Sequence, residues 1–320
     1  MIRLSAKVKT GRIVVLVSLL ALALGWFLVR RDSAGHAKTE SRKQMAGEVA
    51  RPDESRTKAF LERRRPSRVP GEAQAETIPA HLLPLMDVPG CRTFYPPWEL
   101  LTKLTVEDKA LLMREYRNRS NAADRAAIVR ALAHLGGDDV VDLFIYSLSL
   151  EFSGRELTTT VDGRENEEVA LMKLVSALGI LSAKNDAAYA FLKQGIDPSF
   201  WKVSVQWRSK LGNETYGVLT ALSIQALGMS GRQEIRPLLE RLRNTDLVNR
   251  TGGNEPGART FYGDVVTAAF YNDLVEKRGV EFFHRKWADG ELERYWEGWS
   301  HTDNGKAWRA WSAAKRQTPQ

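Results

Sequence analysis

The sequence predicts an all-α protein, in which a helical domain follows a single membrane-spanning helix and a disordered linker. Three observations lead to this prediction. A 17-residue apolar run lies at 13–29, a charged segment with few large apolar residues follows at 30–77, and apolar residues recur at helical spacing in 78–320. Hydrophobic residues make up 43% of the 320 residues, which is enough for a sizeable core.

The apolar run at 13–29 reads IVVLVSLLALALGWFLV and carries no charge. As a helix rising 1.5 Å per residue it is about 25 Å long, which crosses a bilayer when flanking arginines extend it. A cleaved signal peptide is the alternative, because Ala-Leu-Ala at 21–23 resembles a small-residue cleavage site. The run continues past this motif and ends in Arg30 and Arg31, which favours a retained signal anchor.

The orientation of this anchor follows from the charges on its two sides. A short basic tail, residues 1–12, precedes the span, and basic residues also follow it, so the positive-inside rule is almost balanced. A short basic N-terminus before a first helix usually stays in the cytoplasm. We therefore expect a single-pass inner (plasma) membrane protein with a cytoplasmic N-terminus and a periplasmic or extracytoplasmic domain.

The positive charge of the chain is concentrated before the domain. The net charge is +8, but residues 1–70 hold 16 Lys and Arg against 6 Asp and Glu, which leaves 31 against 33 for the rest. The domain thus lacks the basic footprint of a nucleic-acid binder, and we expect no nucleic-acid partner. Residues 30–77 have the composition of a disordered linker. The single cysteine, Cys91, excludes an intramolecular disulfide and a Cys-based zinc site.

Helical periodicity defines the domain, residues 78–320. Its first part, 78–98, contains five prolines and cannot form a long helix. Beyond it, apolar residues fall at i, i+3, i+4 and i+7 in two clear stripes: Leu171, Leu174, Val175 and Leu178, and then Ile235, Leu238, Leu239 and Leu242. Asp138 and Asp139 follow two glycines, so we expect them to cap the N-terminus of a helix.

A short element recurs along these helices. It consists of Ala-Leu followed by a glycine: Ala131-Leu132 with Gly136, Ala177-Leu178 with Gly179, and Ala226-Leu227 with Gly228. The alanines are 46 residues apart (131 to 177) and then 49 (177 to 226), and a fourth unit without the glycine lies near 266–270. Such a period is typical of stacked helical pairs.

Two of these segments, RALAHLGGDDVVDLFIYSL and IQALGMSGRQEIRPLLERL, resemble HEAT and the related lyase-type HEAT-like repeats, over about residues 105–290. The resemblance implies an α-solenoid of helical pairs that exposes an extended face for binding proteins. The chain departs from the family in its spacing, at or above the roughly 40 to 47 residues expected, and in an irregular insert at 153–164.

No motif for a nucleophile, a phosphate or a dinucleotide occurs in the chain, and we expect no catalytic residue and no cofactor. Glu281-x-x-His284 is the one metal-like pairing on a helix face, and we expect an ion pair there and no metal. The expected function is therefore a membrane-anchored protein-interaction scaffold or adaptor at the cell envelope, with a protein partner.

Aromatic residues gather near the C-terminus, where five of the nine tryptophans follow residue 285. Trp287, Tyr295, Trp296 and Trp299 are the candidate residues for binding a ligand or partner. The alternative is that these rings seal the last helices onto the end of the stack. A groove beside them is the basis of a second hypothesis for the function, an envelope enzyme or a sugar-polymer-binding protein.

Overall fold

The computed structural model describes residues 78–86, 98–118, 122–151, 167–205, 212–244 and 256–317. All of them belong to one compact unit, 52–320. Every regular element in these ranges is a helix, so the predicted all-α class is confirmed. The predicted membrane span at 13–29 and the predicted linker at 30–77 lie outside the described residues. None of the helices in the described ranges is both long and apolar enough to span a bilayer.

The helices begin and end as follows: η1 (Ala80–Leu82), α3 (Leu83–Met86), α4 (Trp98–Leu101), α5 (Val106–Asn118), α6 (Ala122–Leu135), α7 (Asp138–Tyr146), η2 (Ser147–Glu151), α8 (Glu167–Leu181), α9 (Asp186–Gln194), α10 (Pro198–Val205), α11 (Gly212–Gly228), α12 (Ile235–Asn244), α13 (Pro256–Arg278), α14 (Val280–Ala288), α15 (Leu292–Ser300) and α16 (Asp303–Gln317). In the described part of the proline-rich beginning, residues 78–86, the chain forms only the short helices η1 and α3, in agreement with its composition.

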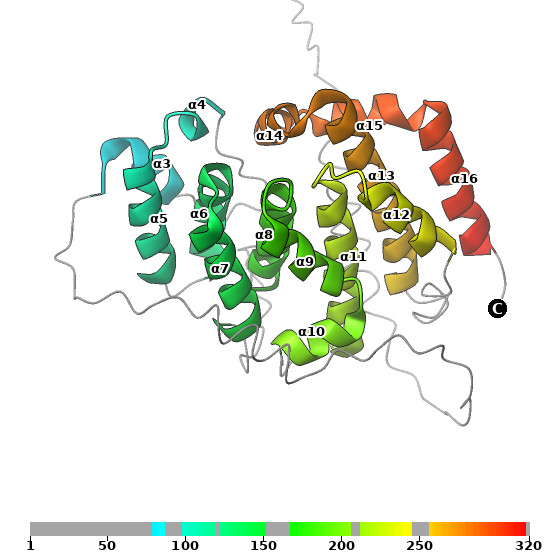
Figure 1. The fold of residues 1–320 in the computed structure, drawn as a ribbon, viewed down its shortest axis with the longest axis horizontal. Helices are drawn as coiled ribbons and strands as arrows, with labels where there is room; N and C mark the ends of the chain where they lie inside the picture. Colours follow the sequence, from blue (N-terminus) through cyan, green and yellow to red (C-terminus); the bar gives the residue numbers. More distant parts are fainter. Residues whose placement is uncertain are drawn as a thin grey trace, which may run out of the picture. The chain divides into compact units, whose positions relative to one another are not determined.

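A row of helices forms the centre of the domain. Helices α5, α6, α8, α11, α13 and α16 follow one another in chain order, and each packs on the next (Figure 1). A second layer covers one side of this row: α7 packs on α8, α9 packs on α8 and α11, and α12 packs on α11 and α13. The chain therefore alternates between the row and the second layer.

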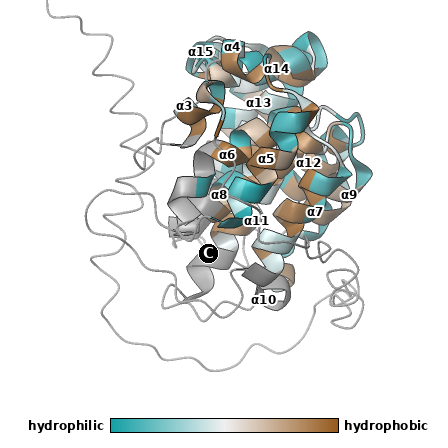
Figure 2. Cartoon of the chain, turned by 90° about the vertical axis from the view of Figure 1, so that its left-hand side faces the viewer, coloured by the Kyte–Doolittle hydropathy of each residue, from teal (hydrophilic) through white to brown (hydrophobic). Residues whose placement is uncertain are grey.

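Composition explains which helices lie in the middle. Along α8 and α11 no residue whose burial is described is exposed, and most of these residues are apolar. A helix that is apolar over most of its surface is stable only when neighbours cover it on several sides. In contrast, α12 buries Ile235, Leu239 and Leu242 on one face and exposes Arg241 on the other. In the second layer, α7 carries mostly hydrophobic residues and α9 a larger hydrophilic share (Figure 2).

Two of the three recurring Ala-Leu elements lie where row helices approach closely, whereas a Cβ atom added to Gly136, after α6, would meet only the Leu181 side chain, at 3.7 Å. A Cβ atom added to Gly179 of α8 would lie 2.8 Å from the Cα atom of Ala226 on α11. A Cβ added to Gly228 of α11 would lie 2.7 Å from the Cα atom of Ala268 on α13. The backbones are therefore in direct contact at both crossings, which requires glycine at positions 179 and 228. The fourth unit supplies Ala268, the partner of the last glycine.

The capping prediction for Asp138 was wrong by one position. The N-cap of α7 is Gly137, whose φ of +107° makes the turn before the helix, and Asp138 is already in the first helical turn. There its carboxylate accepts a hydrogen bond of 2.6 Å from the Asn185 side-chain amide, at the start of α9. Asp139 forms an ion pair with Lys109 of α5 at 3.0 Å. Both carboxylates thus connect α7 to its neighbours.

Candidate functional site

Half-buried residues recur at one-turn spacing on three successive helices of the row. They include Lys173 and Ser176 on α8, Leu222 and Gln225 on α11, and Thr267 and Tyr271 on α13. We call these six residues the open face. On α13 the exposed Gly263 lies one turn before Thr267, so it extends the stripe of open-face residues along this helix. The open face combines apolar and hydrogen-bonding side chains and is continuous across neighbouring helices.

A buried carboxyl group lies at the edge of the open face. Asp264 of α13 accepts a hydrogen bond from the side-chain amide of Gln225 through Oδ1, and its Oδ2 atom is buried with no hydrogen-bond partner. Burial raises the pKa of Asp264 well above its usual value, so the carboxyl group tends toward its neutral form. Asp264 therefore contributes most to the free energy of unfolding at low pH, where its buried carboxyl group is neutral. This contribution is lost as the pH rises through the pKa that Asp264 has in the folded state.

Helix α14 leaves α13 and crosses the C-terminal ends of α6 and α8. Its His284 ring lies with its centroid 6.5 Å from that of His134, near the end of α6. The guanidinium group of Arg130, one turn earlier on α6, lies over the ring of Trp287. Glu281 forms an ion pair of 3.1 Å with Lys184, which follows α8. These contacts join residues that are far apart in the sequence.

Both histidines of this contact favour the neutral form. Burial, with Arg130, His134 and Lys184 nearby, lowers the pKa of His284 to about 3. Burial also lowers the pKa of His134, and Arg130 acts in the same direction while Glu281 opposes it. The Nδ1 atom of His134 and the Nε2 atom of His284 are buried and have no hydrogen-bond partner. Protonation would therefore place charges beside two existing cations without an acceptor for the new N–H groups.

The Glu281-x-x-His284 pairing separates into two different contacts. Glu281 forms an ion pair with Lys184 from the turn after α8, and both side chains are exposed. The ion pair expected within Glu281-x-x-His284 is therefore replaced by a contact to another part of the domain. His284 turns to the aromatic and basic residues of α6. In the part of the chain that the structure describes, no group of three or more His, Cys, Asp or Glu residues is arranged to hold a metal ion.

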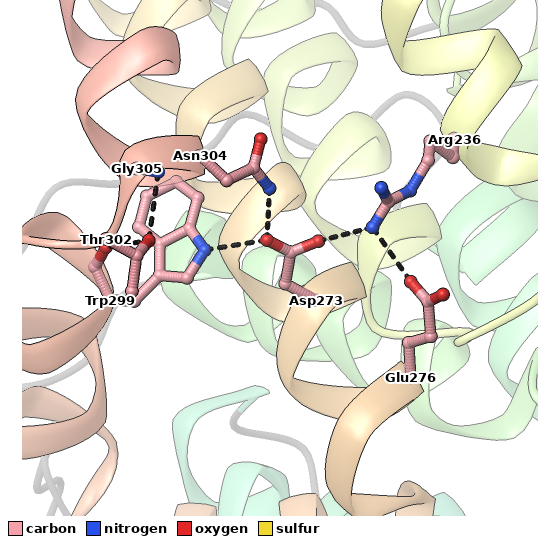
Figure 3. Close-up of polar contacts among 7 residues, drawn as sticks. All are labelled: Arg236, Asp273, Glu276, Trp299, Thr302, Asn304 and Gly305. Atoms are coloured by element: carbon pink, nitrogen blue, oxygen red, sulfur yellow. Dashed lines mark hydrogen bonds and ion pairs between the residues drawn. The ribbon is translucent and has the colours of Figure 1, made fainter.

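A second polar cluster holds the C-terminal helices together. The carboxylate of Asp273 on α13, 3% exposed, accepts hydrogen bonds from Arg236 of α12 at 2.6 Å and from the indole Nε1 of Trp299 on α15 at 2.8 Å. The side-chain amide of Asn304 on α16 also donates to it (Figure 3). Arg236 donates further to Glu276 at 2.8 Å. Since the donors come from three helices, Asp273 fixes the position of α12, α15 and α16 relative to α13.

The four aromatic candidates pack against other rings. The ring centroid of Trp296 lies 5.1 Å from that of Phe270 and 5.5 Å from that of Trp299, whose own ring is buried. Tyr295 packs on Phe282. Trp287 stacks on Phe283 of the same helix, with ring centroids 5.9 Å apart. Tyr295, Trp296 and Trp287 are half-buried. Binding of a ligand or partner through these rings remains a prediction.

Sequence patterns identified some of the contacts described above and missed others. The spacing of Trp296 and Trp299 placed them on one helix face, and both contact Phe270. Asp273 and the contact between His134 and His284 were not identified, because each depends on partners from distant parts of the chain. The available signal was an acidic residue, Asp273, between the apolar residues of the segment FYNDLV in α13. No family model, curated protein or solved structure matches the chain.

Proposed function

We propose that this chain is a membrane-anchored helical-repeat scaffold or adaptor that binds another protein at the cell envelope. The observation that carries the proposal is the close backbone contact at matching places in successive row helices, Gly179 with Ala226 and then Gly228 with Ala268. A repeated crossing of this kind is what a stack of similar helical pairs requires. It supports the interpretation of the domain as a HEAT-like α-solenoid, in which the pairs are α6 with α7, α8 with α9, and α11 with α12.

The open face is the surface we assign to the partner. It extends over three neighbouring helices, and its side chains are half-buried, so a partner segment can gain contact area without a large rearrangement of the domain. Leu222 and Tyr271 offer apolar contacts, while Gln225 and Thr267 offer hydrogen-bonding groups. This combination suits a segment of protein chain, whose backbone needs hydrogen-bond partners and whose side chains bury apolar area.

The N-terminal part gives this scaffold its place in the cell. In the proposal, residues 13–29 anchor the chain in the inner (plasma) membrane, and the domain lies on the periplasmic or extracytoplasmic side. The segment 30–77 acts as a flexible linker whose root-mean-square span is about 40 Å for a coil of this length. A linker of that reach allows the domain to meet a partner that is not itself at the membrane surface.

Site-specific photo-cross-linking in cells tests which face binds a partner. A photoreactive phenylalanine analogue is placed in the full-length chain at Leu222 or Thr267 on the open face, and at Lys193 of α9 or Arg241 of α12 as controls on the second layer. We expect both open-face positions to give an adduct with the same protein and both controls to give none. Adducts restricted to the second layer, or adducts at none of the four positions, would contradict the proposed binding surface.

A further inference from the structure

We propose that the junction of α6, α14 and the turn after α8 is a binding site for a phosphate group. Its residues are Arg130 and His134 on α6, His284 on α14, and Lys184 in the turn, and we call them the phosphate site. They share no residue with the open face, so the site goes beyond the binding of a protein partner. Two observations carry the proposal. Two buried ring nitrogens have no hydrogen-bond partner, and the charge around them is positive.

Helices α6 and α14 hold the side chains of this site in place. Arg130 and His134 are one turn apart on α6, and His284 and Trp287 have a similar spacing on α14. The two histidine rings lie beside each other, and the guanidinium group of Arg130 lies over the ring of Trp287. Phe283, which is 0% exposed, anchors α14 in the core. The polar groups of the site therefore stand on a rigid frame.

The two histidines lack an acceptor for their ring nitrogens. The Nδ1 atom of His134 and the Nε2 atom of His284 are buried and have no hydrogen-bond partner. Such an atom costs about 1 to 3 kcal/mol, and in a native structure it often marks a site for water or an ion. A neutral ring can carry its proton on either nitrogen, so both of these atoms can donate. Since both residues are half-buried, part of each side chain is open to solvent.

The charge around these nitrogens selects an anion. Burial is the largest cause of the low pKa of His284, and Arg130, His134 and Lys184 lower this pKa further, so the electrostatic potential at the ring is positive. Glu281 neutralises Lys184 in an exposed ion pair, which leaves a net charge of +1 from Arg130. The carbonyl groups at the end of α6 contribute about −0.5, which is smaller.

A phosphate group suits this arrangement better than a carboxylate does. A phosphate monoester has a charge of about −1.5 to −2 at pH 7 and three strong acceptor oxygens. These oxygens point in different directions, so separate oxygens can accept from His134 and His284 while a third faces the guanidinium group of Arg130. Lys184 is 79% exposed and can turn from Glu281 toward the anion. Inorganic phosphate and the phosphomonoester headgroup of a lipid share this chemistry.

Isothermal titration calorimetry of the full-length chain in a non-ionic detergent tests the site. The first probe is inorganic phosphate, and the second is dihexanoyl phosphatidic acid, a soluble lipid with a phosphomonoester headgroup. We expect saturable binding of inorganic phosphate at one site. Tighter binding of the phosphatidic acid supports a lipid headgroup as the natural ligand, and equal or weaker binding supports a free phosphate. The absence of saturable binding of inorganic phosphate would overturn the proposal.

Glu281→Gln is the most informative variant, because it should improve binding. It removes the carboxylate that competes for Lys184 and raises the net charge of the site. Inorganic phosphate should therefore bind about threefold more tightly, as expected for one exposed charge. Glu281 is itself 70% exposed, so the substitution leaves the core unchanged. An affinity equal to that of the wild type, or a weaker one, would overturn the proposal.

His284→Phe tests the ring nitrogen directly. It keeps an aromatic ring in α14 but has no N–H group, so inorganic phosphate should bind about tenfold more weakly. His301→Gln is the matched control, because His301 is exposed and contacts Glu297 on α15. This control should bind phosphate as the wild type does. Wild-type affinity in His284→Phe would also overturn the proposal, and Glu281→Gln decides the question if His284→Phe does not fold.

Discussion

Replacing Gly228 with alanine is expected to destabilise the domain by about 3 kcal/mol, the upper part of the range for an overpacked core. The added Cβ atom would lie 2.7 Å from the Cα atom of Ala268, closer than two carbon atoms can approach. Because the obstacle is backbone and not a flexible side chain, α11 and α13 would have to separate. Urea unfolding followed by tryptophan fluorescence measures the change in the free energy of unfolding.

The same helix contains a matched control for this substitution. A Cβ atom added to Gly217 of α11 would meet nothing within 4 Å. In a helix, alanine is more favourable than glycine by about 1 kcal/mol, so Gly217→Ala should leave the domain as stable as the wild type or slightly more stable. Equal effects of the two substitutions would mean that the contact between Gly228 and Ala268 does not set the spacing of the row.

The second large effect is expected from Asp273→Ala, a loss of about 2 to 3 kcal/mol, the upper part of the range for removing an acceptor from buried hydrogen-bond donors. The substitution leaves the indole N–H of Trp299 without its acceptor in a buried position. It also removes the acceptor of Asn304 and one of the two acceptors of Arg236, which keeps Glu276. The free energy of unfolding, from urea titration, measures the total effect.

The control for Asp273 is its neighbour in the same network. Glu276 accepts a hydrogen bond only from the half-exposed Arg236 and is itself exposed. Pairs of this kind contribute about 0 to 1 kcal/mol, so Glu276→Ala should cost little. If Asp273→Ala were as mild as Glu276→Ala, the C-terminal helices would be held by aromatic packing and not by the buried carboxylate.

The helical class could be predicted because it depends on local pattern. Apolar spacing over 171–178 and 235–242 predicted α8 and α12. The recurrence of Ala-Leu with glycine indicated a repeat, but the close contacts at Gly179 and Gly228 were not predicted, because they depend on how the helices pack on one another. The face that a helix buries can be identified in a sequence, because the apolar residues of that face recur every three or four positions.

The polar contacts could not be predicted in the same way. His134 and His284 lie 150 residues apart (134 to 284), and nothing local in either segment specifies the other. The acidic residues after Gly137 were interpreted as caps because glycine followed by aspartate is a helix-start pattern, but the turn geometry placed Asp138 one position further into α7. Long-range pairing and the path of a turn depend on the whole fold, so sequence spacing alone leaves them open.

Affinity capture of the full-length chain from detergent-solubilised membranes tests the central claim most directly, with mass spectrometry of the proteins that co-purify. Gly263→Arg adds a charged side chain to the end of the open-face stripe, and Gly298→Arg adds one to the exposed surface of α15; both positions have open space for a Cβ atom. The account predicts one near-stoichiometric protein that co-purifies with the wild type and with Gly298→Arg but is lost with Gly263→Arg. Retention of that protein by Gly263→Arg, or its absence from the wild-type sample, would contradict the account.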